Sequence, residues 1–208
     1  MPRKNKLTMI FGGTFNPPHI GHKAIIEAVL ALPETEELIV MPDNLPPHKE
    51  VGEDFAGGVD RFNMCRIICR DFSRVSVSDY EINKSGKSYT VDTLEEFKSL
   101  YPEKQFGLVI GGDMLSSFDE CWYRFEDILK LCTLVVFVRK GENSRIFKDK
   151  LNYLTSLGAK IILCEAEIPE ASSSEIRNAL QSGGIGATLN KEVLEYIKEN
   201  HLYGQKGN

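Results

Sequence analysis

The chain has 208 residues, of which 42% are hydrophobic and 26% charged, and its formal net charge is −5 at pH 7. These proportions are ordinary for a globular protein. The acidic balance argues against indiscriminate binding to nucleic acid or to anionic membranes, because both need a cationic protein surface. At this length we expect a single domain over residues 1–208, with a core that needs no disulfide or metal.

Neither the ends of the chain nor its cysteines suggest export. No apolar run approaches the roughly 18 residues of a membrane span, and the run after Lys6 is too short for a signal peptide, so we expect a cytoplasmic protein. The five cysteines are odd in number and form no C-x-x-C pair. Cys65 and Cys69 lie four positions apart, which favours two small apolar residues on one helix face over a metal site.

Strand-like and helix-like segments alternate along the chain. In chain order the patterns predict a strand over 7–11, a helix over 19–32, a strand over 38–41, a loop over 43–58, a helix over 59–71, a strand over 74–78, a helix over 90–100, a strand over 105–110, a helix over 125–131, a strand over 133–138, a helix over 146–157, a strand over 160–164, and helices over 174–181 and 191–200. Thr90 is expected to cap its helix. The alternation predicts an α/β fold, a doubly wound Rossmann-like domain with a mainly parallel central sheet. Ligands of such sheets bind beyond the carboxyl ends of the strands.

The segment over residues 12–22, Gly-Gly-Thr-Phe-Asn-Pro-Pro-His-Ile-Gly-His, lies where the first strand gives way to the first helix. Two glycines let the backbone approach a ligand, and the helix that follows offers unpaired N–H groups to an anion. His19 and His22 are three positions apart, so both project from one face of the first turn, where imidazole nitrogens can donate to phosphate oxygens. The pattern favours a phosphate site. The alternative is a glycine–proline turn with two solvated histidines.

Two other nucleotide-binding patterns are absent. The glycines at 12, 13 and 21 do not form G-x-G-x-x-G. Gly86-Lys87-Ser88 imitates the end of a P-loop, but Glu81 stands where that loop needs its first glycine.

A second anion site is predicted at Ser172, Ser173 and Ser174, which lead into a helix that carries Arg177 one turn later. Hydroxyls, helix N–H groups and a planar guanidinium suit phosphates. The alternative is a helix N-cap with Glu175 in the first turn and a surface arginine. His48 and Lys49 lie on the proline-rich loop, where Lys49 either neutralises phosphates or is simply solvated.

The 12–22 segment and Ser172-Ser173-Ser174-Glu175-Ile176-Arg177 together resemble the nucleotidylyltransferase superfamily with its H-x-G-H element. Within it the chain is similar to bacterial nicotinate-mononucleotide adenylyltransferases. This resemblance rests on Pro46-Pro47-His48-Lys49, Asp60-Arg61 with Met64, Ser88-Tyr89-Thr90-Val91-Asp92-Thr93-Leu94, Gly111-Gly112-Asp113, Trp122, Arg139 and the ending from Tyr196-Ile197 to Leu202-Tyr203. Asn16 departs from the aspartate of many relatives; either residue is expected to cap the first helix. The stretch 183–190 lacks the family's usual basic residues and proline.

The resemblance implies transfer of AMP from ATP to nicotinate mononucleotide, giving nicotinic acid adenine dinucleotide (deamido-NAD) and pyrophosphate, in NAD biosynthesis. The implied catalytic residues are His19, His22, Arg177 and Lys49. The implied ATP-binding residues are Gly12, Gly13, Thr14, Phe15, Gly21, Asp113, Arg139, Ser172, Ser173 and Ser174. The mononucleotide would contact His48, Tyr89, Thr90, Trp122 and Tyr123, with the pyridine ring stacked on Trp122. Trp122 is the only tryptophan in the sequence, and the alternative is that it belongs to the hydrophobic core. Mg²⁺ is implied with ATP, held mainly by phosphates and not by a protein cage.

Three rivals stay open at this point. An adenylyltransferase for nicotinamide mononucleotide differs only in an amide for a carboxylate, and one for phosphopantetheine is disfavoured by Trp122 and by the length. A catalytically inactive nucleotide-binding regulator is the rival from another class, and His22→Ala separates it from an enzyme. We expect no nucleic-acid partner and no membrane; homo-oligomerisation stays open.

Overall fold

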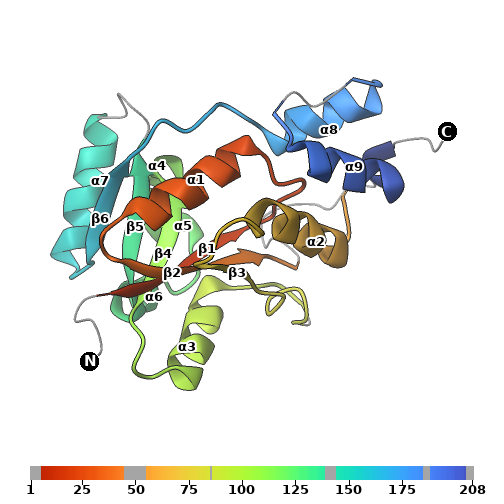
Figure 1. Cartoon of the computed structure of the whole chain (residues 1–208). Helices are drawn as coiled ribbons and strands as arrows, with labels where there is room; N and C mark the ends of the chain where they lie inside the picture. Colours follow the sequence, from red (N-terminus) through yellow and green to blue (C-terminus); the bar gives the residue numbers. More distant parts are fainter. Residues whose placement is uncertain (1–5, 45–54, 85, 139–143, 185–187, 205–208) are drawn as a thin grey trace.

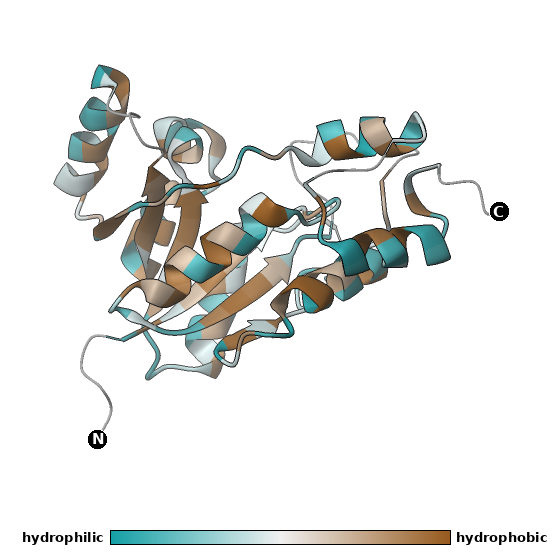
Figure 2. Cartoon of the chain, turned by 45° about the horizontal axis from the view of Figure 1, so that its top comes forward, coloured by the Kyte–Doolittle hydropathy of each residue, from teal (hydrophilic) through white to brown (hydrophobic). Residues whose placement is uncertain are grey.

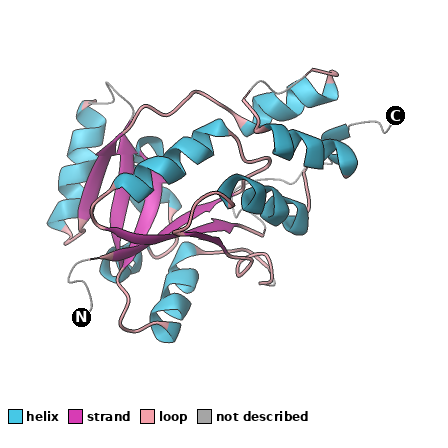
Figure 3. Cartoon of the chain, viewed as in Figure 1, coloured by secondary structure: helices cyan, strands magenta, loops and turns pink. Residues whose placement is uncertain are grey.

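Six parallel strands form the centre of the structure, a computed structural model that describes residues 6–44, 55–84, 86–138, 144–184 and 188–204. The strands are β1 (Leu7–Gly13), β2 (Thr35–Pro42), β3 (Val75–Val77), β4 (Phe106–Gly111), β5 (Cys132–Val138) and β6 (Ile161–Glu165). Their order across the sheet is β3-β2-β1-β4-β5-β6, and neighbouring strands in this order run parallel to each other (Figure 3). The chain therefore reverses its direction of winding between β1 and β4, which makes their carboxyl ends the expected ligand crevice.

The helices connect and cover these strands (Figure 1). They are α1 (Ile20–Ala31), α2 (Gly58–Cys69), α3 (Thr90–Leu100), α4 (Gly112–Ser116), α5 (Phe118–Cys121), α6 (Phe125–Leu131), α7 (Arg145–Ser156), α8 (Ser173–Gln181), α9 (Lys191–Glu199) and the 3₁₀ turn η1 (Leu202–Gly204). Every predicted strand and helix is confirmed, with ends shifted by three residues at most. The sequence missed α4, α5 and η1 because elements of three to five residues are too short to show a periodicity. No helix among these ranges is long and apolar enough to span a bilayer.

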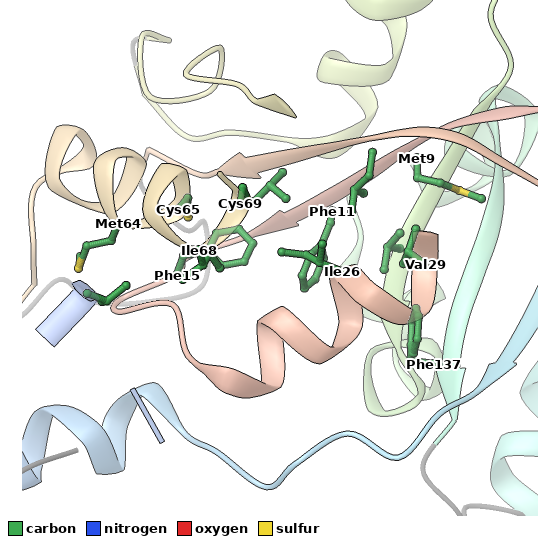
Figure 4. Packing of buried hydrophobic residues seen from close by; sticks show 14 of the residues in the cluster. Met9, Phe11, Phe15, Ile26, Val29, Met64, Cys65, Ile68, Cys69 and Phe137 are labelled. Atoms are coloured by element: carbon green, nitrogen blue, oxygen red, sulfur yellow. The ribbon is translucent and has the colours of Figure 1, made fainter. Parts of the chain in front are cut away.

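Alternate residues of β1 point to opposite faces of the sheet and so belong to two different cores. Met9 and Phe11 pack with α1 and α2, whereas Ile10 packs with α3, α6 and α7. Figure 4 shows the first core around Met9 and Phe11, and Figure 2 shows hydrophobic strands beneath helices whose outer faces are hydrophilic. Cys65 and Cys69 lie in the first core, as the sequence predicted, and burial raises the pKa of the Cys69 thiol to about 12.

Two helix-capping predictions are wrong. The N-cap of α1 is His19, and Asn16 is instead buried, with its side-chain Oδ1 accepting hydrogen bonds from the Ala56 N–H at 3.1 Å and the Tyr203 hydroxyl at 2.7 Å. The N-cap of α3 is Tyr89, in extended backbone, and Thr90 is the first helical residue. The proline pair at 17–18 delays the first helix, because the residue before a proline disfavours helical backbone.

Arg61 on α2 joins three segments at the carboxyl ends of β1 and β2. Its side chain is fully buried and donates to the carbonyl oxygens of Thr14 at 2.8 Å, Asn44 at 3.0 Å and Ala56 at 3.1 Å. Its Nη1 also lies 3.2 Å from a carboxylate oxygen of Asp43. One guanidinium thus satisfies carbonyl groups from both loops that border the crevice, which otherwise would be buried without donors.

Replacing Arg61 with alanine should lower the free energy of unfolding by about 3–5 kcal/mol, because the variant leaves a carboxylate and three carbonyls without their donor. The matched control is Arg70→Ala, just beyond the same helix, whose ion pairs to Asp71 and Glu192 are exposed and worth at most about 1 kcal/mol. Urea denaturation followed by circular dichroism measures both. Equal losses in the two variants would contradict the role given to Arg61.

Candidate active site

A cavity of about 300 Å³ lies at the switch point between β1 and β4. Its walls come from the ends of these strands, the segment before α3, and the α4–α5 region. The lining residues are Ile10, Gly12, Gly13, Asp43, Glu81, Ser88, Tyr89, Thr90, Thr93, Leu94, Leu108, Val109, Met114, Ser117, Cys121, Trp122, Tyr123 and Ile128. The structure therefore brings together four of the five residues predicted to bind the mononucleotide, with two of the predicted ATP-binding glycines.

Aromatic rings form one wall of this cavity. Trp122 directly follows α5 and stacks on Phe118, with ring centroids 4.9 Å apart and planes inclined by 27°. Tyr89 and Tyr123 form a second pair, also with centroids 4.9 Å apart. Trp122 is half-buried, packs against the second core and lines the cavity. Both predicted places for this residue, in the core and beside a ligand, therefore agree in part with the structure. An indole backed by another ring and open to the cavity can stack on a planar ligand.

Two carboxylates face the same cavity, and the sequence analysis assigned neither of them to a site. Glu81 is 8% exposed, and the Thr93 hydroxyl donates to it at 2.7 Å; burial raises the pKa of its carboxyl group. Asp43 accepts a hydrogen bond from the Thr14 hydroxyl at 3.1 Å as well as from Arg61. Asp43 could have been predicted as a site residue, because it stands directly after β2, where ligands of parallel sheets bind. Glu81 could not, because nothing in the sequence distinguishes a single glutamate in a polar turn. Among the described lining residues there is no lysine, arginine or histidine, although Asp43 is itself paired with the buried guanidinium of Arg61.

The two histidines lie side by side at the start of α1, with ring centroids 3.8 Å apart. The His19 backbone N–H donates to His22 Nδ1 at 3.1 Å, and the Phe15 ring lies edge-on to His22 at 4.9 Å. Gly21 permits this arrangement, because a Cβ there would come within 3.1 Å of the His19 ring and 3.2 Å of the Pro169 carbonyl oxygen. The predicted common face is therefore confirmed.

Both imidazoles are held in the neutral form in the absence of an anion. Burial lowers the pKa of His19 to about 4. Desolvation, and then the proximity of His19, lower the pKa of His22 well below its ordinary value. Nδ1 of His19 is buried and makes no hydrogen bond within the described residues. A buried polar atom without a partner is rare.

The N-terminus of α8 docks onto the loop that carries the histidines. Arg177 Nη1 donates to the Asn16 carbonyl oxygen at 2.8 Å, and the Ser173 hydroxyl donates to the Pro17 carbonyl oxygen at 2.9 Å. Ser172 is the N-cap of α8, and its hydroxyl accepts from the Glu175 N–H at 3.5 Å. Ser172 is therefore a helix N-cap, as the alternative prediction had it. Arg177 and Ser173 place the second predicted anion site, at the start of α8, next to the first, at the histidines.

The remaining predicted residues differ in what they can contact. The Phe15 side chain is 2% exposed, so only its backbone is open to a nucleotide. Asp113 is exposed in the first turn of α4 and is not part of the cavity lining. His48, Lys49 and Arg139 lie outside the described residues. Within the described ranges, no three His, Cys, Asp or Glu side chains gather into a metal-binding group.

Comparisons with known proteins agree with this geometry. The cytidylyltransferase-like family matches residues 10–179. A probable nicotinate-nucleotide adenylyltransferase of Caldicellulosiruptor bescii is 39% identical over 93% of this chain and 97% of its own length. One from Listeria innocua is 34% identical over 95% of this chain and 97% of its own length. These relatives confirm the resemblance that the motifs indicated.

The fold is also that of a solved structure, Plasmodium falciparum nicotinic acid mononucleotide adenylyltransferase complexed with NaAD. It superposes with a TM-score of 0.77 over 97% of this chain and 98% of its own, at 21% identity. This likeness supports the Rossmann-like architecture. From the family match and the curated relatives together, the chain belongs to the cytidylyltransferase-like family and, within it, to the nicotinate-nucleotide adenylyltransferases.

Proposed function

We propose that this protein transfers the adenylyl group of ATP to nicotinate mononucleotide, releasing pyrophosphate and forming nicotinic acid adenine dinucleotide. The observation that carries the proposal is the β1–α1 loop. Gly12 and Gly13, which end β1 just before the loop, line the aromatic cavity; the loop itself leads into the histidine pair, and its Asn16 carbonyl oxygen accepts from Arg177. A ring-binding cavity and a phosphate site thus meet on one loop, as a reaction between a mononucleotide and a nucleoside triphosphate requires.

The reaction is an in-line displacement at phosphorus. A 5′-phosphate oxygen of the mononucleotide attacks the α-phosphorus of ATP, and the bond to the bridging oxygen breaks as pyrophosphate leaves with the electron pair. Such a reaction needs positioning and charge stabilisation more than a protein nucleophile. His19 and His22 donate to the oxygens on which negative charge grows, while Arg177, Ser172, Ser173 and Ser174 hold the leaving phosphates.

The pyridine ring belongs in the aromatic cavity. Its cationic ring stacks on the negative face of the Trp122 indole, a cation–π contact that partial desolvation of the cavity strengthens. Its own carboxylate is expected at the N-terminus of α3, where Thr90 is the first helical residue and backbone N–H groups are unpaired. The wrong assignment of Thr90 as a cap does not weaken this argument, because its N–H still belongs to the helix end.

Mg²⁺ is expected to arrive with ATP and to be held by the phosphates and water. The donor set at the histidine loop fits this, because imidazole, guanidinium and hydroxyl groups contact phosphate oxygens and leave the metal no protein cage. Bound there, the ion supplies charge neutralisation to the departing pyrophosphate. The proposed site also includes the remaining residues that the resemblance implied: Lys49, His48, Arg139, Asp113, Thr14, Phe15, Gly21, Tyr89 and Tyr123. We propose that the whole chain is one nucleotidylyltransferase domain.

The deciding experiment incubates the protein with ATP and Mg²⁺ and, in parallel, with nicotinate mononucleotide, nicotinamide mononucleotide or phosphopantetheine. Pyrophosphate release and the mass of the product are measured. We expect turnover with the acid mononucleotide, because its carboxylate suits the α3 N-terminus. Preference for the amide would overturn the roles of Thr90 and Trp122 but keep the chemistry; ATP binding without turnover on any acceptor would identify a regulator.

Substituting His19 or His22 by alanine should lower kcat by about 10²- to 10³-fold, the usual cost of removing one donor to a developing oxyanion. His201→Asn is the matched control, because His201 is exposed and asparagine tolerates its left-handed backbone (φ 51°). Initial rates of pyrophosphate release provide the measurement. A histidine-loop variant that retained wild-type kcat would remove that residue from the proposed chemistry.

The stability of the ligand-free protein should fall as the pH drops from 6.5 to about 4. The unfolded chain binds a proton at His19 near pH 6.5, whereas the folded chain does so only near pH 4, so acidification favours unfolding over this window. The loss due to His19 is at most about 3 kcal/mol. Urea titrations at several pH values measure it, and His19→Asn should remove the share of the slope due to His19 while the share due to His22, whose pKa is also lowered, remains. An unchanged slope in that variant would show that His19 is not the titrating group.

A further inference from the structure

The carboxyl-terminal turn η1 reaches back across the molecule to the loop that carries the histidines. The Tyr203 hydroxyl donates to Asn16 Oδ1 at 2.7 Å, although the two residues are 187 positions apart. Tyr203 is 4% exposed and Asn16 is 3% exposed, so water does not compete for this bond. We propose that Tyr203 is a positioning residue for adenylyl transfer, acting through Asn16 on Arg177. The inference rests on the function proposed above.

Asn16 is the point through which the effect passes. Its side-chain Oδ1 accepts from Tyr203 and from the Ala56 N–H at 3.1 Å, while its backbone carbonyl oxygen accepts from Arg177 Nη1 at 2.8 Å. Hydrogen bonds that fix the asparagine side chain therefore also fix the carbonyl that orients the guanidinium. Arg177 in turn donates to Ser174 Oγ at 3.4 Å, at the N-terminus of α8.

The backbone of η1 supports a specific role for this contact. Tyr203 has φ 57° and ψ 37°, and His201 has φ 51°, in the left-handed region that residues other than glycine rarely adopt. The turn holds this conformation while the Tyr203 ring packs in the first core. A strained conformation persists where the surrounding contacts over-determine it, and here the contact is with the proposed active-site loop. Burial also raises the pKa of Tyr203, so its hydroxyl remains a donor at neutral pH.

The chain offers a matched control for this tyrosine. Tyr196 of α9 also carries a hydrogen-bonded hydroxyl, on a half-buried side chain, which donates to Asp60 Oδ1 at 3.0 Å and accepts from Asn63 Nδ2 at 3.0 Å. Both partners lie on α2 and have no part in the proposed site. Tyr203→Phe and Tyr196→Phe each remove one hydrogen-bonded hydroxyl from a tyrosine ring, but only the Tyr203 hydroxyl contacts the proposed active-site loop.

The experiment compares the steady-state kinetics of the two variants with ATP and nicotinate mononucleotide. Tyr203→Phe should lower kcat/KM for ATP by about tenfold and leave KM for the mononucleotide unchanged, because Arg177 holds the ATP phosphates. Tyr196→Phe should match the wild type. A double-mutant cycle with Arg177→Ala should show that the two losses are not additive, as expected if Tyr203 acts through Arg177.

Two results would overturn the inference. One is that Tyr203→Phe keeps wild-type values of kcat and of both KM constants while losing stability, which would make the contact purely structural. The other is full additivity with Arg177→Ala. If the wild-type protein shows no turnover, the proposed function fails, but the role of Tyr203 can still be tested by calorimetric titration with ATP. A roughly tenfold weaker affinity of Tyr203→Phe for ATP supports that role, and an unchanged affinity refutes it.

Discussion

The β1–α1 loop is buried, and its carbonyl groups must find donors inside the protein. The loop cannot supply them itself, because the pair of prolines at 17–18 has no N–H groups. Donors come from distant elements instead: Arg61 bonds the Thr14 carbonyl, Arg177 the Asn16 carbonyl and Ser173 the Pro17 carbonyl. This requirement draws α2 and α8 onto the loop. The same contacts place Arg177 and Ser173 against the loop that leads into the histidine pair.

The same packing sets the electrostatics of the site. Because the two imidazoles are desolvated and close together, neither is charged at neutral pH without a ligand. If the site binds a triphosphate as proposed, it offers neutral N–H donors and gains positive charge only when phosphate oxygens favour protonation. Donors that are already oriented cost little reorganisation during the reaction, which is the main electrostatic advantage of an enzyme site over water.

The sheet and its long helices could be predicted from sequence because apolar periodicity reports directly which faces are buried. The same logic predicted that the glycines and histidines of residues 12–22 stand where a strand meets a helix, and the structure confirms that position, whereas their role in binding phosphate stays a prediction. Asn16 was assigned wrongly because a local rule for capping cannot see Tyr203, which lies 187 positions away. Glu81 and Arg61 were missed as organising residues for the same reason: their roles depend on which distant carbonyls and carboxylates the fold brings to them.

The cavity places a limit on how the acid and the amide of the pyridine ring can be distinguished. No described lining residue is a lysine, arginine or histidine, so the described part of the cavity wall offers the carboxylate neutral donors, among them the N-terminus of α3. A helix N-terminus favours a negative group by about 0.3–2 kcal/mol, which corresponds to a preference of roughly 2- to 30-fold. Among these described groups, a preference for the acid above roughly 30-fold has to come from the geometry of hydrogen bonding. A carboxylate can accept hydrogen bonds at both oxygens, whereas the amide presents an N–H₂ group to one of the same donors and leaves that donor unpaired.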